Sequence, residues 1–304
     1  MNLTPSKPCI VGIGEALFDV FEAGPRLGGA PLNVAVHAHR LLRNAGGEGR
    51  VVSRIADDEL GNRLLDAVMG FGLSTSTIQR GAAAPTGRVE VEQHNDGGHT
   101  FHIAASSAWD EIKFDTEVAA LAARCAAVAF GTLAQRSDTT RQSIRVFLAA
   151  APQALKLFDV NFRSSDGRDF FDRETLVAGC EAADLVKIND EEVQQTCELA
   201  EVEDEQELLV RYALNAVILT RGKRGTAALT AEGWAQGGSA SYERAEDADS
   251  VGAGDACTAG LLASLVLGRS MPQALDLANH MGAFVANQSG ATPQLPGRLT
   301  DWLD

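Results

Sequence analysis

Cysteines are few in this sequence, and their arrangement excludes a disulfide framework and a cysteine-rich metal site. The five cysteines are scattered and odd in number, and none forms a CxxC pair; they are Cys9, Cys125, Cys180, Cys197 and Cys257. Disulfide-rich proteins and zinc sites instead space their cysteines in recognisable patterns. We therefore expect small core cysteines in a reducing compartment.

Basic residues are also scarce, because 26 Lys and Arg residues stand against 41 Asp and Glu residues, and the formal net charge is -15. No Lys/Arg cluster offsets this charge, so binding to nucleic acid or to an anionic membrane is not expected. An anionic substrate would need backbone amides, a few basic side chains or a metal ion to hold it.

Long apolar runs are missing as well, since none approaches the ~20 residues that a membrane helix needs. The apolar run at residues 8–20 is interrupted by Glu15 and Asp19 and lacks a small-residue cleavage pattern. It therefore resembles a buried strand more than a signal peptide. We expect a soluble protein of the cytoplasm.

Short β-rich runs alternate with helix-like segments over most of the chain. The predicted strands are 9–14, 51–55, 127–133, 155–162, 184–189 and 216–222, and helices are predicted at 31–42, 58–70, 138–150 and 203–214. Strands that are apolar on both faces and separated by helices form a parallel sheet with helices on both sides. The pattern thus predicts a doubly wound α/β fold.

One segment breaks the alternation. Residues 87–94 and 99–105 show period-two patterning around Asn95-Asp96-Gly97-Gly98, which predicts a β-hairpin. This hairpin could be a lid over a site at the strand ends, or an extension of the sheet edge.

The last third of the chain contains a predicted strand pair at 226–233 and 239–246, and two helices at 254–268 and 272–288. No linker, repeat or low-complexity tract separates these segments from the rest. Residues 1–304 are therefore predicted to form a single domain, with the hairpin around 86–106 as a small appendage.

The stretch DSVGAGD, Asp249 to Asp255, precedes a helix that is apolar almost throughout. Gly252, Ala253 and Gly254 can expose backbone amides at the helix N-terminus, which favours an anion. Asp255 would then be placed to accept a proton from a substrate hydroxyl. A capping carboxylate is the alternative, although capping requires neither two glycines nor Asp249.

A second turn lies near the N-terminus. Gly12-Ile13-Gly14 could begin a dinucleotide fingerprint, but Leu17 replaces its third glycine and makes the match weak. Other residues here are more informative. Asp19 lies just past a predicted strand end, and Gly28, Gly29 and Asn33 lie at the turn before the next helix. An acid, an amide and bare backbone could together chelate the hydroxyl groups of a sugar. Asn33 could instead satisfy local backbone groups.

Two further motifs follow predicted strands. In VKINDEEV, Asn189 and Glu192 share one helix face and could hold Mg²⁺ through its waters, or form a capping-box helix start. In FDVNFR, Asp159, Asn161 and Arg163 alternate towards a strand end, where α/β proteins bind ligands. Arg163 could meet a phosphate or a sugar oxygen, or make a surface salt bridge.

Two features of the hairpin region allow alternative interpretations. His94, His99 and His102 suggest a metal, but their spacing is not a recognised ligand pattern. Trp109 could stack on a sugar or pack in the core.

Several motifs in order resemble the ribokinase-like sugar kinases of the PfkB family. GGAPLNVAVHAHRLL is similar to the N-terminal signature of that family and DSVGAGD to its C-terminal signature. Between them, the resemblance extends over almost the whole chain through VSRIADDELG, FDVNFR, VKINDEEV and LTRGKRG. It implies a ribokinase-like α/β fold, with a mostly parallel sheet and a small β lid, and transfer of the γ-phosphoryl group of ATP to a sugar.

The resemblance also implies roles for individual residues. Asp255 would be the general base, and Gly252, Ala253 and Gly254 would form the anion hole. The sugar would be held by Asp19, Gly28, Gly29, Asn33, Asn161 and Arg163. Thr220 and Gly222 would line the nucleotide site with Asn279 near the adenine, and Asn189 and Glu192 would lie on the Mg²⁺ side. The hairpin would exclude water as a competing acceptor.

A monovalent-cation site for K⁺ is implied at Asp249 and the backbone of Val251, beside Val285, Gln288 and Gly290. Gln294 stands where the family commonly has a small hydroxyl residue, which argues against activation by potassium, and Ala56 replaces a usual glycine.

The motifs are most similar to those of fructokinases, so fructose is the expected acceptor. Ribose and 2-keto-3-deoxygluconate are alternatives, as is a non-catalytic sugar or nucleotide sensor. Val89, Val91, Phe101 and Ile103 give the hairpin an apolar face, from which we expect a homodimer.

Overall fold

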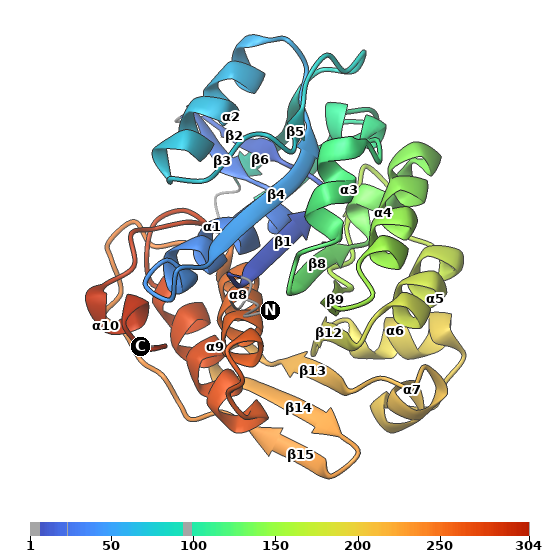
Figure 1. The fold of residues 1–304 in the computed structure, drawn as a ribbon, viewed down its shortest axis with the longest axis vertical. Helices are drawn as coiled ribbons and strands as arrows, with labels where there is room; N and C mark the ends of the chain where they lie inside the picture. Colours follow the sequence, from blue (N-terminus) through green and yellow to red (C-terminus); the bar gives the residue numbers. More distant parts are fainter. Residues whose placement is uncertain (1–6, 23, 94–98, 304) are drawn as a thin grey trace, which may run out of the picture.

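A nine-stranded sheet runs through the molecule (Figure 1), in the order β15-β14-β13-β12-β9-β8-β1-β4-β5. The computed structural model describes residues 7–22, 24–93 and 99–303. Strands β5 to β13 of this order are parallel, whereas β14 and β15 are antiparallel. Their bounds are β1 Cys9–Ile13, β4 Glu48–Arg54, β5 Ile78–Gln79, β8 Ala127–Gly131, β9 Leu155–Asp159, β12 Leu185–Asn189, β13 Ala216–Thr220, β14 Thr226–Thr230 and β15 Gly233–Gln236.

Helices cover both faces of this sheet. One face carries α1 (Ala30–Leu42), α8 (Ala253–Val266) and α9 (Met271–Val285). The other carries α3 (Thr116–Ala122), α4 (Asp138–Ala150), α5 (Arg173–Ala182), α6 (Val193–Ala200) and α7 (Glu205–Arg211). Two more helices, α2 (Glu59–Gly70) and α10 (Gly297–Thr300), lie towards the periphery.

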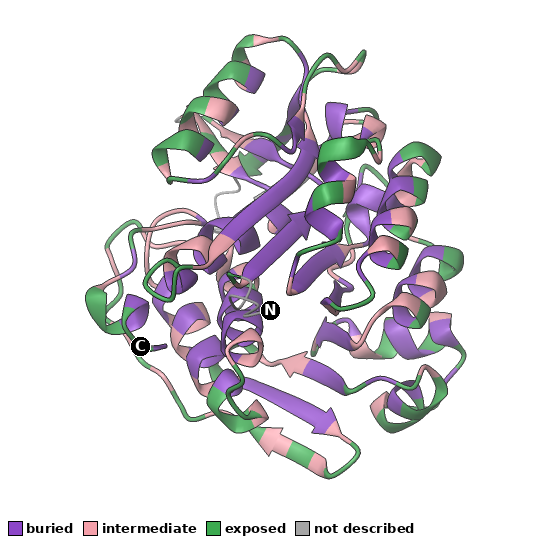
Figure 2. Ribbon diagram, viewed as in Figure 1, coloured by how far each residue is buried: buried purple, intermediate pink, exposed green. Residues whose placement is uncertain are grey.

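Alternate residues of each central strand enter different cores. Val11 of β1 belongs to the core beneath α3 to α7, whereas its neighbour Ile10 packs with residues of α1, α8 and α9. Phe158 and Leu157 of β9 divide in the same way, and Figure 2 shows the central strands as buried. This two-sided burial confirms the predicted α/β fold.

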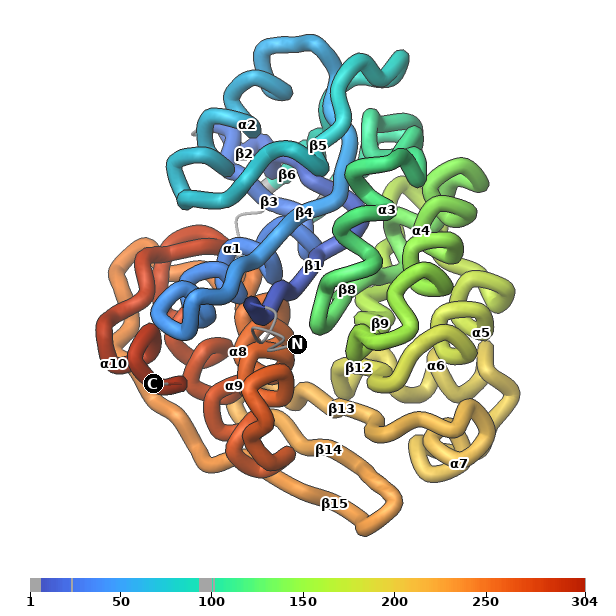
Figure 3. The backbone as a smooth tube through the Cα atoms, viewed as in Figure 1, coloured from blue at the N-terminus to red at the C-terminus, as the bar shows by residue number. Residues whose placement is uncertain are grey.

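The chain reverses direction across the sheet at β1. From β1 it passes through the small sheet and α1 to β4 on one side, and it reaches β8 on the other side only later (Figure 3). The strand ends at such a reversal form the crevice in which α/β proteins bind ligands.

The predicted hairpin is confirmed, but it is no extension of the main sheet. Strands β6 (Gly87–Gln93) and β7 (His99–Ile103) pair within a separate four-stranded sheet, here called the small sheet. Its other strands, β2 (Leu17–Phe21) and β3 (Gly24–Gly28), were not predicted. The turn at 95–98 and His94 lie outside the described residues.

The apolar side of the hairpin faces the chain's own core. Val89, Val91 and Ile103 are buried, and Val89 and Ile103 pack in one cluster with Leu17 and Trp109. The side chain of Phe101 lies outside the described part of the structure. Because this face is already covered, it gives no support to the predicted dimer.

Of the two roles predicted for Trp109, packing in the core is the one that the structure shows. The indole is 0% exposed, and a Cβ added to Gly87 would lie 2.0 Å from its ring. Arg136 lies over the same ring, 4.9 Å from a ring centroid.

Two predictions for the second half of the chain are wrong: one predicted strand is not formed, and one predicted helix is shorter than expected. Residues 239–246 form no strand, because β14 turns back directly through Gly233, at φ 105, into β15. The helix predicted at 203–214 is α7 alone, since Asp204 caps its first turn and Ala213 adopts a left-handed φ of 51 beyond its end. No helix in the described residues is long and apolar enough to cross a membrane.

Candidate active site

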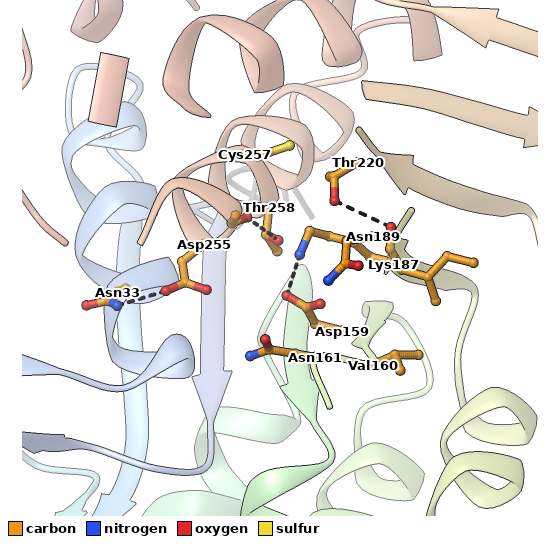
Figure 4. A network of polar contacts seen from close by, with 12 residues as sticks. Asn33, Asp159, Val160, Asn161, Lys187, Asn189, Thr220, Asp255, Cys257 and Thr258 are labelled. Atoms are coloured by element: carbon orange, nitrogen blue, oxygen red, sulfur yellow. Dashed lines mark hydrogen bonds and ion pairs between the residues drawn. The ribbon is translucent and has the colours of Figure 1, made fainter. Parts of the chain in front are cut away.

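Asp255 lies in the first turn of α8 and is paired with α1. The side-chain amide of Asn33 donates a hydrogen bond to its Oδ2 atom, over 2.8 Å (Figure 4). Helix α8 itself has Gly252 as its N-cap, with no side-chain capping bond. Asp255 is thus not a helix cap. Asn33 is 3% exposed, and its side-chain nitrogen donates to a residue of another helix and not to backbone groups nearby in its own segment.

The turn before α8 requires a glycine at its first position. Gly252 has φ 77, and a Cβ there would lie 2.7 Å from Ala291. Gly254 is exposed, and a Cβ on it would lie 3.5 Å from the ammonium nitrogen of Lys187. Since the first amides of a helix lack intrahelical acceptors, this bare turn can bind an anion.

The carboxyl of Asp255 has the electrostatics of a base. Burial raises its pKa to about 6 against the hydrogen bond from Asn33, and the charge of Asp159 raises it further, while Lys187 and Arg163 lower it. A pKa close to neutral lets a carboxylate take up a proton from a substrate and release it again.

A buried ion pair that sequence reasoning missed lies beside this turn. The Nζ atom of Lys187 on β12 is 2.7 Å from Oδ2 of Asp159 on β9, and both side chains are at most 10% exposed. The available signal was a lysine inside an apolar strand, VKIN. The ammonium group of this pair therefore places a positive charge next to Gly254.

The small sheet brings Asp19 towards the carboxyl of Asp255. Asp19 lies within β2, not beyond a strand end as predicted, and burial raises its pKa to about 6 against the charge of Arg163. A Cβ on Gly28 would lie 2.6 Å from its carboxylate, and one on Gly29, at φ 105, would lie 2.5 Å from the carbonyl oxygen of Glu15. Close approach therefore requires both glycines.

Asn161 and Arg163 lie beyond the end of β9 and not along it. Asn161 adopts a left-handed φ of 41, and the Arg163 side chain is exposed, donating to the carbonyl of Phe162 over 3.1 Å. The charge of Arg163 lowers the pKa of Asp19 and Asp255, so this cation faces the carboxylates.

The residues predicted for the nucleotide lie at the end of β13, in the turn after it and on α9. Thr220 ends β13 and donates to the carbonyl of Ile188 over 3.4 Å, and Gly222 is exposed at φ 52. The side chain of Asn279 accepts from the amide of Thr226 and donates to the carbonyl of Gly238. Asn279 thus positions the loops around it.

Asn189 and Glu192 have the capping-box geometry. The carboxylate of Glu192 accepts from the amides of Asn189 and Phe162, while the Asn189 oxygen accepts from the amides of Glu191 and Glu192. Each carboxylate oxygen of Glu192 accepts one of these bonds and keeps a second lone pair, which fits contact with metal-bound water, whereas the Asn189 oxygen already accepts two. In the described residues, no group of three or more His, Cys, Asp or Glu is placed to hold a metal ion.

The loop around Asp249 brings together several residues named for the cation site, and a basic side chain contacts it. The carboxylate of Asp249 accepts from the amides of Val251 and Gly290, and the amide of Asp249 donates to the carbonyl of Gln288. Arg26 of β3 forms an ion pair with the same carboxylate, over 3.0 Å.

The predicted histidine cluster is described only at His102. Its imidazole contacts Asp166 at 2.7 Å and Glu92 at 3.5 Å, which raises the pKa of His102. His94 and the side chain of His99 lie outside the described residues.

Comparison with known proteins places these features in one family. Residues 14–298 match the family described as pfkB family carbohydrate kinase. The chain is 27% identical to fructokinase-1 of Oryza sativa subsp. japonica, over 95% of this chain and 90% of that protein. It is 29% identical to a fructokinase of Klebsiella pneumoniae, over 93% of this chain and 95% of that protein. A fructokinase of Xylella fastidiosa, solved with bound ATP, superimposes with a TM-score of 0.82 at 22% identity, covering 98% of each chain.

Proposed function

Because the chain belongs to the pfkB family of carbohydrate kinases, we propose that it transfers the γ-phosphoryl group of ATP to a hydroxyl group of fructose, giving fructose 6-phosphate. The observation that carries this proposal is the half-buried Asp255, held by Asn33 at the mouth of the glycine turn. The fructokinases among its relatives support the choice of sugar.

In this reaction Asp255 accepts the proton of the attacking hydroxyl while the new O–P bond forms and ADP leaves. The amides at Gly252, Ala253 and Gly254 stabilise the negative charge of the phosphoryl group. The sugar is oriented by Asp19, Gly28, Gly29, Asn33, Asn161 and Arg163. The small sheet acts as the lid of a single kinase domain, excluding water as a competing acceptor.

Thr220, Gly222 and Asn279 contribute to the nucleotide site through the loops that they position. Asn189 and Glu192 would hold Mg²⁺ through its waters, and the ion would supply charge neutralisation at the ATP phosphates. Both residues also fix the start of α6, so their own hydrogen bonds keep this edge of the site in place.

The test is a panel of sugars incubated with ATP and Mg²⁺, with ADP release as the readout. We expect fructose to give the highest kcat/KM. A higher value for ribose or 2-keto-3-deoxygluconate would replace fructose as the acceptor. Tight sugar binding without turnover across the panel would instead indicate a sensor.

The rate should depend on pH through Asp255. A base must be deprotonated to act, and its pKa is raised to about 6. We therefore expect kcat/KM for the sugar to fall about tenfold per pH unit below this value and to level off above it. A profile that stays flat down to pH values near the ordinary pKa of an aspartate, ~4, would contradict this assignment.

A K⁺ site at Asp249 and Val251 is a further part of the proposal. Since Arg26 already neutralises Asp249, K⁺ has to share this carboxylate with a guanidinium. We expect exchange of Na⁺ for K⁺ to change kcat less than about twofold in the native protein and several-fold more in Arg26→Met. An equal response of the two proteins would show that Arg26 does not compete.

A homodimer and a cytoplasmic location stay predictions. All five cysteines are free and buried, which agrees with a reducing compartment. Light scattering tests the assembly, because a mass near 32.1 kDa at every concentration would identify a monomer.

A further inference from the structure

Glu15 is a buried acid near the site, 5% exposed, and takes no part in the proposed reaction. It lies two residues beyond Ile13, the last residue of β1. Because β1 is the strand at which the sheet order reverses, its end opens into the ligand-binding crevice. Asp19 and Asp255 lie in the same region, and the charge of Asp255 acts on Glu15 directly.

The carboxyl of Glu15 is buried without a complete set of hydrogen bonds. The residue is 5% exposed, and its Oε2 atom has no hydrogen-bond partner among the described residues. Burial raises the pKa of Glu15 to about 7; its own backbone amide and the charge of Arg163 oppose that rise. An unpaired buried oxygen destabilises the protein, and a bound ligand that supplies the missing partner would remove this cost.

A small cavity adjoins Glu15. Its volume is about 20 Å³, which is room for one water molecule or one hydroxyl group. Glu15, Ala30 and Asn161 are among its lining residues. Ala30 directly follows Gly29, and Asn161 belongs to the proposed sugar site, so the cavity borders the place where the acceptor would bind.

We propose that Glu15 binds one hydroxyl group of the acceptor sugar, other than the one that is phosphorylated, and thereby determines which sugars are accepted. This inference rests on the proposed function. A hydroxyl group can donate to a carboxylate and accept from a carboxyl, so it satisfies Oε2 in either protonation state. Sugars lacking that hydroxyl would leave the oxygen unpaired and be rejected.

The test compares fructose with analogues that each lack one hydroxyl group, in the native protein, Glu15→Ala and Glu15→Gln. We expect the native protein to reject one analogue by about 100-fold in kcat/KM. Glu15→Ala should lose about the same factor on fructose and less than about threefold on that analogue, so its discrimination disappears. Glu15→Gln keeps a hydrogen-bonding group and should retain most of the discrimination, and the KM for ATP should not move.

Ser53→Ala is the matched control. Ser53 also has a buried, unpartnered oxygen, but it lies on β4 and does not line the cavity, so discrimination should be unchanged. An equal loss in Glu15→Ala on fructose and on every analogue would overturn the inference, because it would show a structural or water-binding role.

Calorimetric binding of the same sugars without ATP separates this inference from the proposed function. If no sugar is phosphorylated, the proposed function fails, and the ratio of dissociation constants still decides the role of Glu15. A native protein that binds none of these sugars would overturn both.

Discussion

Replacing Asp255 with Asn should lower kcat by about 1,000-fold or more, because the amide cannot take the proton from the attacking hydroxyl. The same change should leave the fold intact and make it more stable. The folded-state pKa of Asp255, about 6, lies above the ordinary value of 3.8, so the folded protein binds more protons and loses stability as pH rises between these values. At neutral pH a neutral side chain removes this cost, which for a half-buried group is on the order of 1 kcal/mol.

The measurements are ADP release and urea unfolding at pH 7.5 and pH 5, where the gain in stability should shrink. Asp66→Asn, at an exposed position of α2, is the control and should change neither quantity. Activity within tenfold of the native protein would remove Asp255 as the base. A marked loss of stability would instead show that its carboxylate is favourably paired.

Replacing Lys187 with Met should destabilise the protein by about 3 kcal/mol or more, because Asp159 would be left as a buried charge without its partner. The free energy of unfolding is the measurement. Asp159→Asn combined with Lys187→Met should recover most of this loss, since it removes both charges together. A single variant as stable as the native protein would contradict this account of the pair.

The double variant also tests whether Lys187 acts on the reaction. Its ammonium lies beside Gly254, where the transferred group is proposed to bind. We expect a folded double variant to be 10- to 100-fold slower in kcat, because of the two charges removed the ammonium is the one that lies beside Gly254. Unchanged kcat would restrict Lys187 to a structural role.

The parts of the fold that the sequence predicts well are those in which one physical signal dominates. The parallel strands are apolar on both faces, and Ile10 and Val11 enter opposite cores. Strand β3 was missed because its sequence, GPRLG, resembles a loop, and only its pairing with β2 makes it a strand. Strand β2 was missed with it. Residues 239–246 were wrongly predicted as a strand, because a short alternating pattern does not show whether a neighbouring strand is available for pairing.

Within the site, residues in a glycine-rich or acidic motif were predictable, and long-range partners were not. Asp255 and Gly252 stand in a recognisable turn. The ion pairs around this turn join residues from different segments of the chain, which the sequence does not show. Lys187 pairs with Asp159, and Arg26 pairs with Asp249. For Trp109 the sequence left two roles open, because its position beside the hairpin suggested a ligand, whereas the indole is buried in the core with the guanidinium of Arg136 over it.

The bond between Asn33 and Asp255 joins residues separated by 222 positions in the chain. Nearby, His37 of α1 contacts the carbonyl of Ala291, and Arg40 donates to the carbonyls of Thr292 and Pro293. Contacts between such distant segments close long loops, which has a large entropic cost, and they cannot form before both segments exist. During synthesis the turn before α8 can therefore meet its partner on α1 only when most of the chain has left the ribosome, so the proposed site is completed near the end of synthesis.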